Sequence, residues 1–150
     1  MIGTLLAEVH LRHQRPEAAR AHLDQVRSLT QSMPTYFYEP EIVRVEAEWL
    51  RLDGREDESR RLLLRAIATA REHGSWALAV RSAVALSRLP SATREADLKL
   101  LADLFERLPA ENDADYARDA RALLAEGVGA AAQERPTNSA TPSRSRVWRG

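Results

Sequence analysis

Two histidines near the start of the chain have a spacing that a metal ion could use. His10 and His13 stand three residues apart, and Glu17 follows them. Pro16 separates the pair from Glu17, and no other histidine is placed to complete the three or four ligands that a zinc site needs. The sequence therefore predicts neither a metal site nor a bound cofactor.

The carboxylates and hydroxyls do not form a catalytic pattern either. No serine stands in a Gly-x-Ser-x-Gly turn, and the chain has no Gly-x-x-x-x-Gly-Lys-Ser/Thr phosphate loop. Several acids instead stand near turns or helix starts, where interaction with the helix dipole explains them: Asp24, Asp53, Asp57 and Glu58. We therefore expect a protein that is not an enzyme.

Composition restricts the remaining classes. The chain has 150 residues, enough for one domain with its own core, and no cysteine, which excludes disulfides and thiolate metal sites and favours a reducing cytoplasm. Its 22 basic residues balance its 22 acidic ones, so no net field directs it to nucleic acid or to an anionic membrane. It shows neither a signal peptide nor an apolar run long enough to span a membrane. We expect a cytoplasmic protein without a membrane partner.

Helical periodicity covers the chain as far as Gly127, and no alternating strand pattern competes with it. Gly54 and Gly74 are predicted to end two helices in the left-handed conformation, while Ser75 and Asn112 suit helix starts. The predicted helices are 4–13, one that begins at Pro16, 41–53, 56–73, one from Ser75 to Pro90, 94–108 and one from Asn112 to Gly127. We expect a helical domain over residues 1–127 and a disordered tail over 128–150, where Pro, Ser and Thr are frequent.

Two of the predicted helix pairs repeat with an offset of forty residues. Ala7 aligns with Ala47 and Ala19 with Ser59, and the apolar positions Leu23 and Val26 align with Leu63 and Ala66. Helix pairs that recur at such a period are typical of an α-solenoid, in which each pair packs against the next. The pattern of small residues at the positions where two helices cross resembles that of the tetratricopeptide repeat. The predicted fold is all-α, with antiparallel hairpins stacked as a tetratricopeptide-like solenoid of about seven helices.

A more specific resemblance lies in the amino-acid sequence of residues 38–89. Tyr38-Glu39-Pro40-Glu41, Gly54, Leu64 to Arg71 and Trp76 to Leu89 resemble the C-terminal repeat region of large bacterial signal-transduction ATPases. In that family a nucleotide cyclase or winged-helix domain precedes an NTPase module, and a tetratricopeptide-like array follows. The resemblance implies a regulatory scaffold in a signalling ATPase or transcriptional regulator. The alternative is a fragment of a multidomain adenylate or guanylate cyclase whose catalytic domains are absent here.

The first helix of each hairpin should line a groove that binds a protein or peptide. The predicted groove residues are Glu8, Arg12, Arg44, Glu48, Arg51, Arg81 and Arg88. Their excess of arginine favours an acidic or C-terminal-carboxylate peptide, with the upstream NTPase or cyclase domain as one possible partner. The alternative is that they form solvated helix faces. In either case we expect Arg44, Arg51 and Arg81 to project to solvent.

Two further contacts can be considered from the sequence. The first helix lacks a polar capping repeat, so its apolar side is predicted to meet missing upstream repeats or a second copy of the chain. The tail carries Trp148 among scattered arginines, a composition that could touch nucleic acid. We expect a solvated tail there rather than a nucleic-acid site.

Overall fold

The computed structural model describes residues 2–30 and 38–133, and within these ranges it contains seven α-helices and no strand. The helices are α1 (Ile2–Arg12), α2 (Pro16–Thr30), α3 (Glu39–Leu52), α4 (Glu56–Glu72), α5 (Trp76–Ser87), α6 (Arg94–Phe105) and α7 (Asp115–Gln133). The predicted all-helical fold is confirmed for these residues. Met33, the aromatic loop before Tyr38 and the tail from residue 134 lie outside the described ranges.

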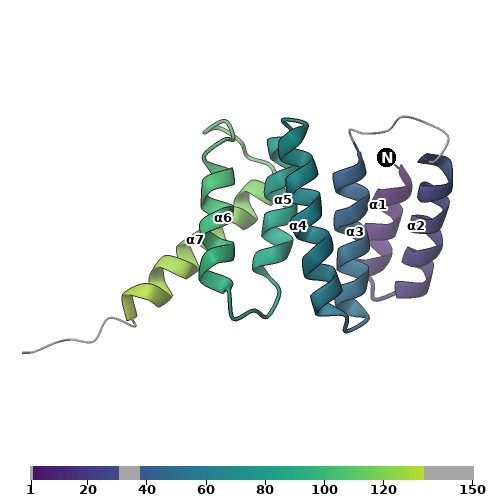
Figure 1. The fold of residues 1–150 in the computed structure, drawn as a ribbon, viewed down its shortest axis with the longest axis horizontal. Helices are drawn as coiled ribbons and strands as arrows, with labels where there is room; N and C mark the ends of the chain where they lie inside the picture. Colours follow the sequence, from purple (N-terminus) through teal and green to yellow (C-terminus); the bar gives the residue numbers. More distant parts are fainter. Residues whose placement is uncertain (1, 31–37, 134–150) are drawn as a thin grey trace, which may run out of the picture.

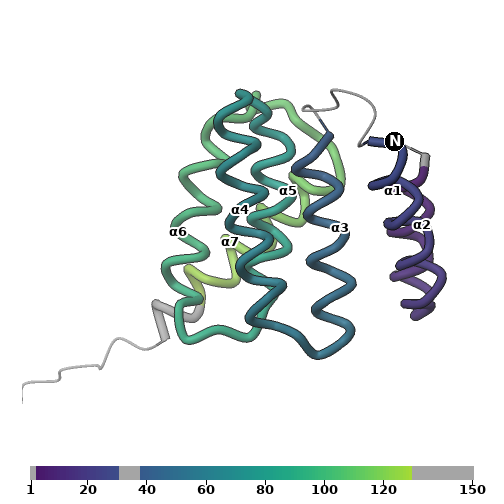
Figure 2. Tube along the Cα trace, turned by 45° about the vertical axis from the view of Figure 1, so that its right-hand side comes forward, coloured from purple at the N-terminus to yellow at the C-terminus, as the bar shows by residue number. Residues whose placement is uncertain are grey.

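The helices form hairpins that stand side by side (Figure 1). Each helix packs against the next one along the chain, and α1, α3, α5 and α7 also contact one another in sequence. Figure 2 shows α1 and α2 at one end of the row and α6 at the other, and Figure 1 shows α7 beside α6. The backbones of α1 and α2 approach only α3 among the other described helices. The first hairpin is therefore attached to the rest of the molecule on one side only.

The predicted glycine stops are present at the ends of α3 and α4. Gly54 and Gly74 have φ of +77° and +66°, the left-handed region that glycine adopts without steric cost. After α3, the amide of Gly54 donates to the Arg51 carbonyl at 3.1 Å and that of Arg55 donates to the Leu50 carbonyl at 2.9 Å. This pair of bonds is the Schellman motif, which satisfies carbonyls that the helix leaves free.

Several predicted helix boundaries need correction; α6, for example, ends at Phe105 rather than at residue 108. The last helix does not end at Gly127 but continues to Gln133, so 128–133 is helical where a disordered tail was expected. A Cβ on Gly127 would lie 2.7 Å from the Leu98 side chain, so this glycine permits α7 to pass close to α6 rather than ending α7. Asn112 accepts from the Ala114 amide at 3.1 Å, ahead of a helix that begins at Asp115. Ser75 stands at the N-cap position of α5 as predicted, although its side chain makes no capping bond.

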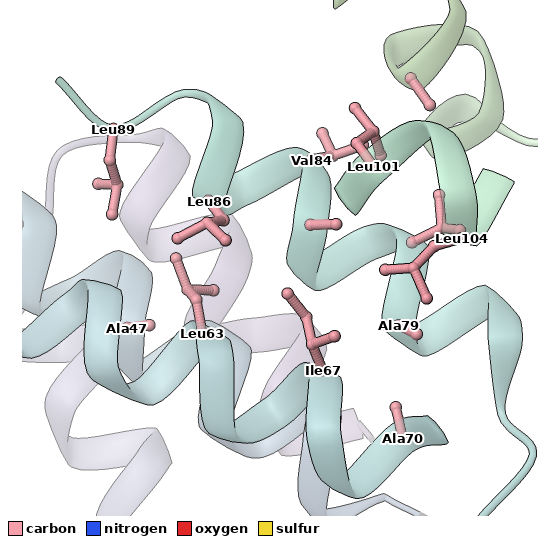
Figure 3. Close-up of a cluster of buried hydrophobic side chains, with 13 residues drawn as sticks. Ala47, Leu63, Ile67, Ala70, Ala79, Val84, Leu86, Leu89, Leu101 and Leu104 are labelled. Carbon is pink, nitrogen blue, oxygen red and sulfur yellow. The ribbon is translucent and has the colours of Figure 1, made fainter. Parts of the chain in front are cut away.

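The main hydrophobic core is formed by residues of the five helices from α3 to α7 (Figure 3). It contains Ala47, Leu63, Ile67, Ala70, Ala79, Val80, Ala83, Val84, Leu86, Leu89, Leu101, Leu104 and Ala120. A second, smaller cluster joins the first hairpin to α3 and consists of Ala7, Leu11, Ala19, Leu23 and Val45, with Trp49 against it. The apolar side chains therefore divide between the two ends of the row.

The predicted close crossing of α3 and α4 is present. Ala47 and Ser59 are both fully buried, and the Ser59 Oγ donates to the Ala47 carbonyl at 2.7 Å. A small side chain on each helix lets the backbones approach, and the hydroxyl finds its partner in the neighbouring helix. None of the described helices combines the length and the apolar character needed to cross a membrane.

Candidate functional site

A groove of about 840 Å³ runs along the odd-numbered helices and is the candidate site. Its lining comes from α1, α3, α5 and the start of α7, because these helices contact one another in sequence. All seven residues that the sequence predicted for a groove line it: Glu8, Arg12, Arg44, Glu48, Arg51, Arg81 and Arg88. The structure therefore brings these residues to one surface.

Four charged residues from three helices meet at this groove: Glu8, Arg44 and Arg81 line its floor, and Glu41 binds the two arginines from beneath the lining. Arg44 donates to Glu41 on its own helix through Nε at 3.0 Å and Nη2 at 2.9 Å. Its Nη2 also donates to Glu8 of α1 at 3.0 Å. Arg81 of α5 lies 2.9 Å from Glu41 and 3.6 Å from Glu8. We call Glu8, Glu41, Arg44 and Arg81 the floor cluster.

Glu41 and Arg44 of the floor cluster favour their ionised forms although both are buried. Burial alone would raise the pKa of Glu41, but the hydrogen bonds from Arg44 and the charges of Arg44 and Arg81 outweigh it and hold that pKa below its usual 4.5. Burial also disfavours the charged form of Arg44, which would lower its pKa, but the carboxylates of Glu41 and Glu8 raise that pKa above its usual value. Each partner stabilises the ionised form of the other, so the two charges depend on the pairing.

The expectation that Arg44, Arg51 and Arg81 project to solvent is wrong for Arg44. Arg44 is only 8% exposed, because α1 and α5 flank it on both sides. Arg51 and Arg81 are partly buried, and Arg51 is held by Glu48 at 2.6 Å. The prediction assumed that this face of α3 is open to solvent, whereas ion pairs from α1 and α5 cover the face on which Arg44 lies.

The excess of arginine in the predicted groove is balanced by acids that the repeat pattern does not predict there. Glu41 in the first turn of α3 neutralises Arg44 and Arg81, and Asp119 of α7 pairs with Arg88 at 2.7 Å. Asp119 was missed because α7 was not expected to reach the groove. The repeat register gave no signal for Glu41, which comes directly after Pro40 at the start of the helix.

The paired charges nevertheless differ in depth. Arg12 exposes 75% of its side chain while its partner Glu8 exposes 17%, and Arg81 exposes 33% against 12% for Glu41. Arg44 is the exception, because it exposes 10% of its side chain against 17% for Glu8. The accessible guanidinium groups on this side of the groove are therefore those of Arg12, Arg51 and Arg81.

Apolar side chains flank these charges. Leu5 and Val9 of α1 and Leu52 of α3 line the groove and are at least 40% exposed. Tyr116 of α7 lines the other end. The groove combines exposed apolar surface with guanidinium groups, a mixture found at protein interfaces.

The histidines singled out for a metal are placed differently. His10 does not pair with His13; its ring stacks on that of His22 of α2, with centroids 5.2 Å apart and planes at 11°. Across the described part of the chain, no three His, Asp or Glu side chains gather in a way that could hold a metal ion.

Comparison with known proteins adds no relative: no family model, no curated protein and no solved structure matches the chain.

Proposed function

We propose that this protein is a non-catalytic, tetratricopeptide-like helical repeat module that binds a protein partner in the groove. The observation that carries this proposal is that seven residues chosen by repeat register line one surface, although they come from three helices. Hairpins packed side by side support the solenoid arrangement, because in such folds each repeat buries its face against the next and leaves a continuous surface for binding.

The partner that suits this groove is a peptide segment with acidic and apolar side chains. Arg12, Arg51 and Arg88 present guanidinium groups that pair well with carboxylates. Leu5 and Val9 offer exposed apolar surface beside them. A peptide segment in which acidic and apolar side chains alternate would pair with the guanidinium groups and cover the apolar surface.

The wider context follows from the resemblance of residues 38–89. We propose a role in a cytoplasmic signalling ATPase or transcriptional regulator, where the module would contact other domains or proteins. The second candidate is a piece of an adenylate or guanylate cyclase polypeptide. The coding sequence upstream separates them: an NTPase frame favours the first, and a cyclase frame without an NTPase favours the second.

A second copy of the chain is a further candidate partner. Leu6 of α1 and Leu29 of α2 are 40% and 63% exposed at the end of the row. Light scattering on wild type and a Leu6→Gln, Leu29→Gln variant tests this. A dimer that the variant loses would support self-association, whereas a monomer at high concentration would reject it.

The groove is tested by a charge-reversal pair that replaces none of the four floor-cluster residues. In Arg12→Glu, Arg51→Glu, the two arginines expose 75% and 36% of their side chains, so the fold should survive because ion pairs open to solvent contribute only about 0–1 kcal/mol. The matched control is Arg61→Glu, Arg71→Glu, which reverses two exposed arginines of α4 that do not line the groove.

Affinity capture followed by mass spectrometry should show partners that wild type and the α4 control retain and the groove variant loses. Circular dichroism must give the same helical content for all three proteins. Partners retained by the groove variant would contradict the proposal.

A further inference from the structure

Glu8 links α1 to cations of two other helices. Its Oε2 lies 3.0 Å from Arg44 Nη2 and 3.6 Å from Arg81 Nη2, so guanidinium groups of α3 and α5 converge on one carboxylate oxygen. Its Oε1 accepts a bond from Arg12 Nη2 at 3.1 Å. One carboxylate therefore connects the first hairpin with the second and the third.

The other three residues of the floor cluster are one acid, Glu41, and two bases, Arg44 and Arg81. They therefore need one further anion, which must come from outside α3 and α5. Glu41 accepts both bonds of the Arg44 fork and also pairs with Arg81, so one carboxylate serves two guanidinium groups. Arg44 is more than nine-tenths buried, and a buried cation without full compensation is costly. The position that Glu8 Oε2 occupies is thus a built site for a carboxylate oxygen.

Glu8 can leave that position without losing its own partner. Arg12 lies one turn away on α1 with 75% of its side chain exposed, and it already binds the other carboxylate oxygen. A rotation of the Glu8 side chain toward Arg12 keeps an ion pair at the surface. The cost of vacating the floor then falls mainly on Arg44 and Arg81, which an incoming anion would neutralise.

The remaining attachment of the first hairpin to α3 is limited. The small cluster around Val45 and Trp49 supplies its apolar part. Its polar part includes a bond from Trp49 Nε1 to the Pro16 carbonyl at 3.0 Å and the ion pair between Arg27 and Glu46. Arg20 of α2 also lies 3.9 Å from Glu46 and places its guanidinium group 5.1 Å from the Trp49 ring centroid. These contacts hold α2, whereas the ion pairs of Glu8 hold α1, so their loss would loosen α1 first.

We propose that Arg44 and Arg81 form a carboxylate-binding subsite on the groove floor and that Glu8 is its internal occupant, which an acidic side chain of a bound peptide replaces, loosening the first hairpin. This inference rests on the proposed function, because it assumes a peptide in the groove. It adds the chemistry of one subsite and a consequence of binding for α1 and α2.

The subsite is tested by chemical rescue of Glu8→Ala with sodium acetate. The variant should have a lower Tm than wild type, and acetate should recover most of the loss in a saturable way when sodium chloride keeps the ionic strength constant. Glu48→Ala is the matched control, since it also removes a groove carboxylate bonded to an arginine, but at a partly exposed pair. Glu8→Ala, Arg81→Ala should lose the rescue because one of the two cations is gone.

If Glu8→Ala is unfolded without acetate, acetate-dependent recovery of helical circular dichroism is the same test. Equal effects of acetate on Glu8→Ala and Glu48→Ala, or no effect on either, would overturn the subsite.

The exchange of occupants is tested on the wild-type chain by hydrogen–deuterium exchange with hexaglutamate, against hexaglutamine as control. Hexaglutamate should speed exchange in α1 and α2 and leave α4 and α5 unchanged. Unchanged exchange in α1 and α2 at saturating hexaglutamate would overturn the replacement of Glu8. Acetate rescue without any captured partner would support the subsite and reject the proposed function, so the two failures can be told apart.

Discussion

The first and second hairpins have the same pattern of buried residues but different surroundings. Ala7 and Ala47 are both fully buried, and Leu23 and Leu63 are equally buried forty residues apart. Yet α3 has helices on both sides, whereas the backbones of α1 and α2 approach only α3 among the other described helices. The repeat therefore determines how the two helices of a pair pack, and the neighbours determine whether a charged side chain on that pair is solvated or enclosed.

The arginines show this difference most clearly. Arg12 lies on the end helix and exposes three quarters of its side chain, while Arg44 lies on the enclosed helix and exposes a tenth. We expect Arg44→Glu to lower the free energy of unfolding by about 3–5 kcal/mol, because it removes the partner of buried Glu41 and adds a third carboxylate. Urea unfolding followed by circular dichroism measures this.

Arg12→Glu is the counterpart at the end of the row. It should change the free energy of unfolding by less than about 1 kcal/mol, since solvent screens an exposed pair. Equal losses in the two variants would mean that the environments of α1 and α3 do not differ as the structure shows.

The close helix crossings give a second, smaller contrast. Ala47→Leu should cost about 1–3 kcal/mol, because the added side chain overpacks the contact with α4 and disturbs the Ser59 bond to the Ala47 carbonyl. Ala7→Leu should cost about 1 kcal/mol or less, since the first hairpin has one neighbour and can shift outward. Thermal unfolding of both variants decides the matter, and an unchanged Tm for Ala47→Leu would contradict the crossing.

Much of this could be predicted because it depends on local pattern. Short stretches of sequence show the apolar period of each helix and the small residues at the α3–α4 crossing. They also show the glycines that follow Asp53 and His73. The groove positions also followed, since repeat register places them on the odd-numbered helices.

What could not be predicted depends on contacts between distant segments. Nothing near Arg44 indicates that Glu8 and Arg81 enclose it. Gly127 was misread because a glycine that ends a helix and one that lets two helices approach look alike in sequence, and only Leu98 of α6 distinguishes them.

Acid should weaken the enclosed cluster. The pKa of Glu41 is held below its usual 4.5, so the unfolded chain takes up this proton first as the pH falls. The stabilisation is therefore fully present above about 4.5 and is lost as the pH falls through the folded-state pKa. Glu41→Gln should reduce the difference in free energy of unfolding between pH 7 and pH 3.

Glu58→Gln provides the matched variant for this measurement. Arg55 also holds the pKa of Glu58 below its usual value, but the pair lies at the surface. We expect it to change the pH dependence less than Glu41→Gln. A larger effect from Glu58→Gln would reject the assignment of acid sensitivity to the enclosed cluster.

The smallest expected effect concerns the turn that ends the first helix of each pair. Gln14 has φ of +55° and its amide donates to the Leu11 carbonyl at 3.0 Å, while the Arg15 amide donates to the His10 carbonyl at 2.8 Å. This is the bonding pattern of Gly54 forty residues later, with a residue that has a Cβ in the left-handed region. Gln14→Gly should therefore raise the free energy of unfolding by about 0.5 kcal/mol, since relief of the strain exceeds the added entropy of the unfolded chain only slightly.

The reverse exchange, Gly54→Gln, should lower the free energy of unfolding by about 1–2 kcal/mol. A Cβ at position 54 would meet nothing within 4 Å, so the loss would come from the backbone conformation alone. Urea unfolding of both variants compares the two turns directly. A higher free energy of unfolding for Gln14→Gly together with a lower one for Gly54→Gln would show that the two hairpins share one turn geometry. A loss of stability in Gln14→Gly would show that the first turn is not held in the left-handed conformation.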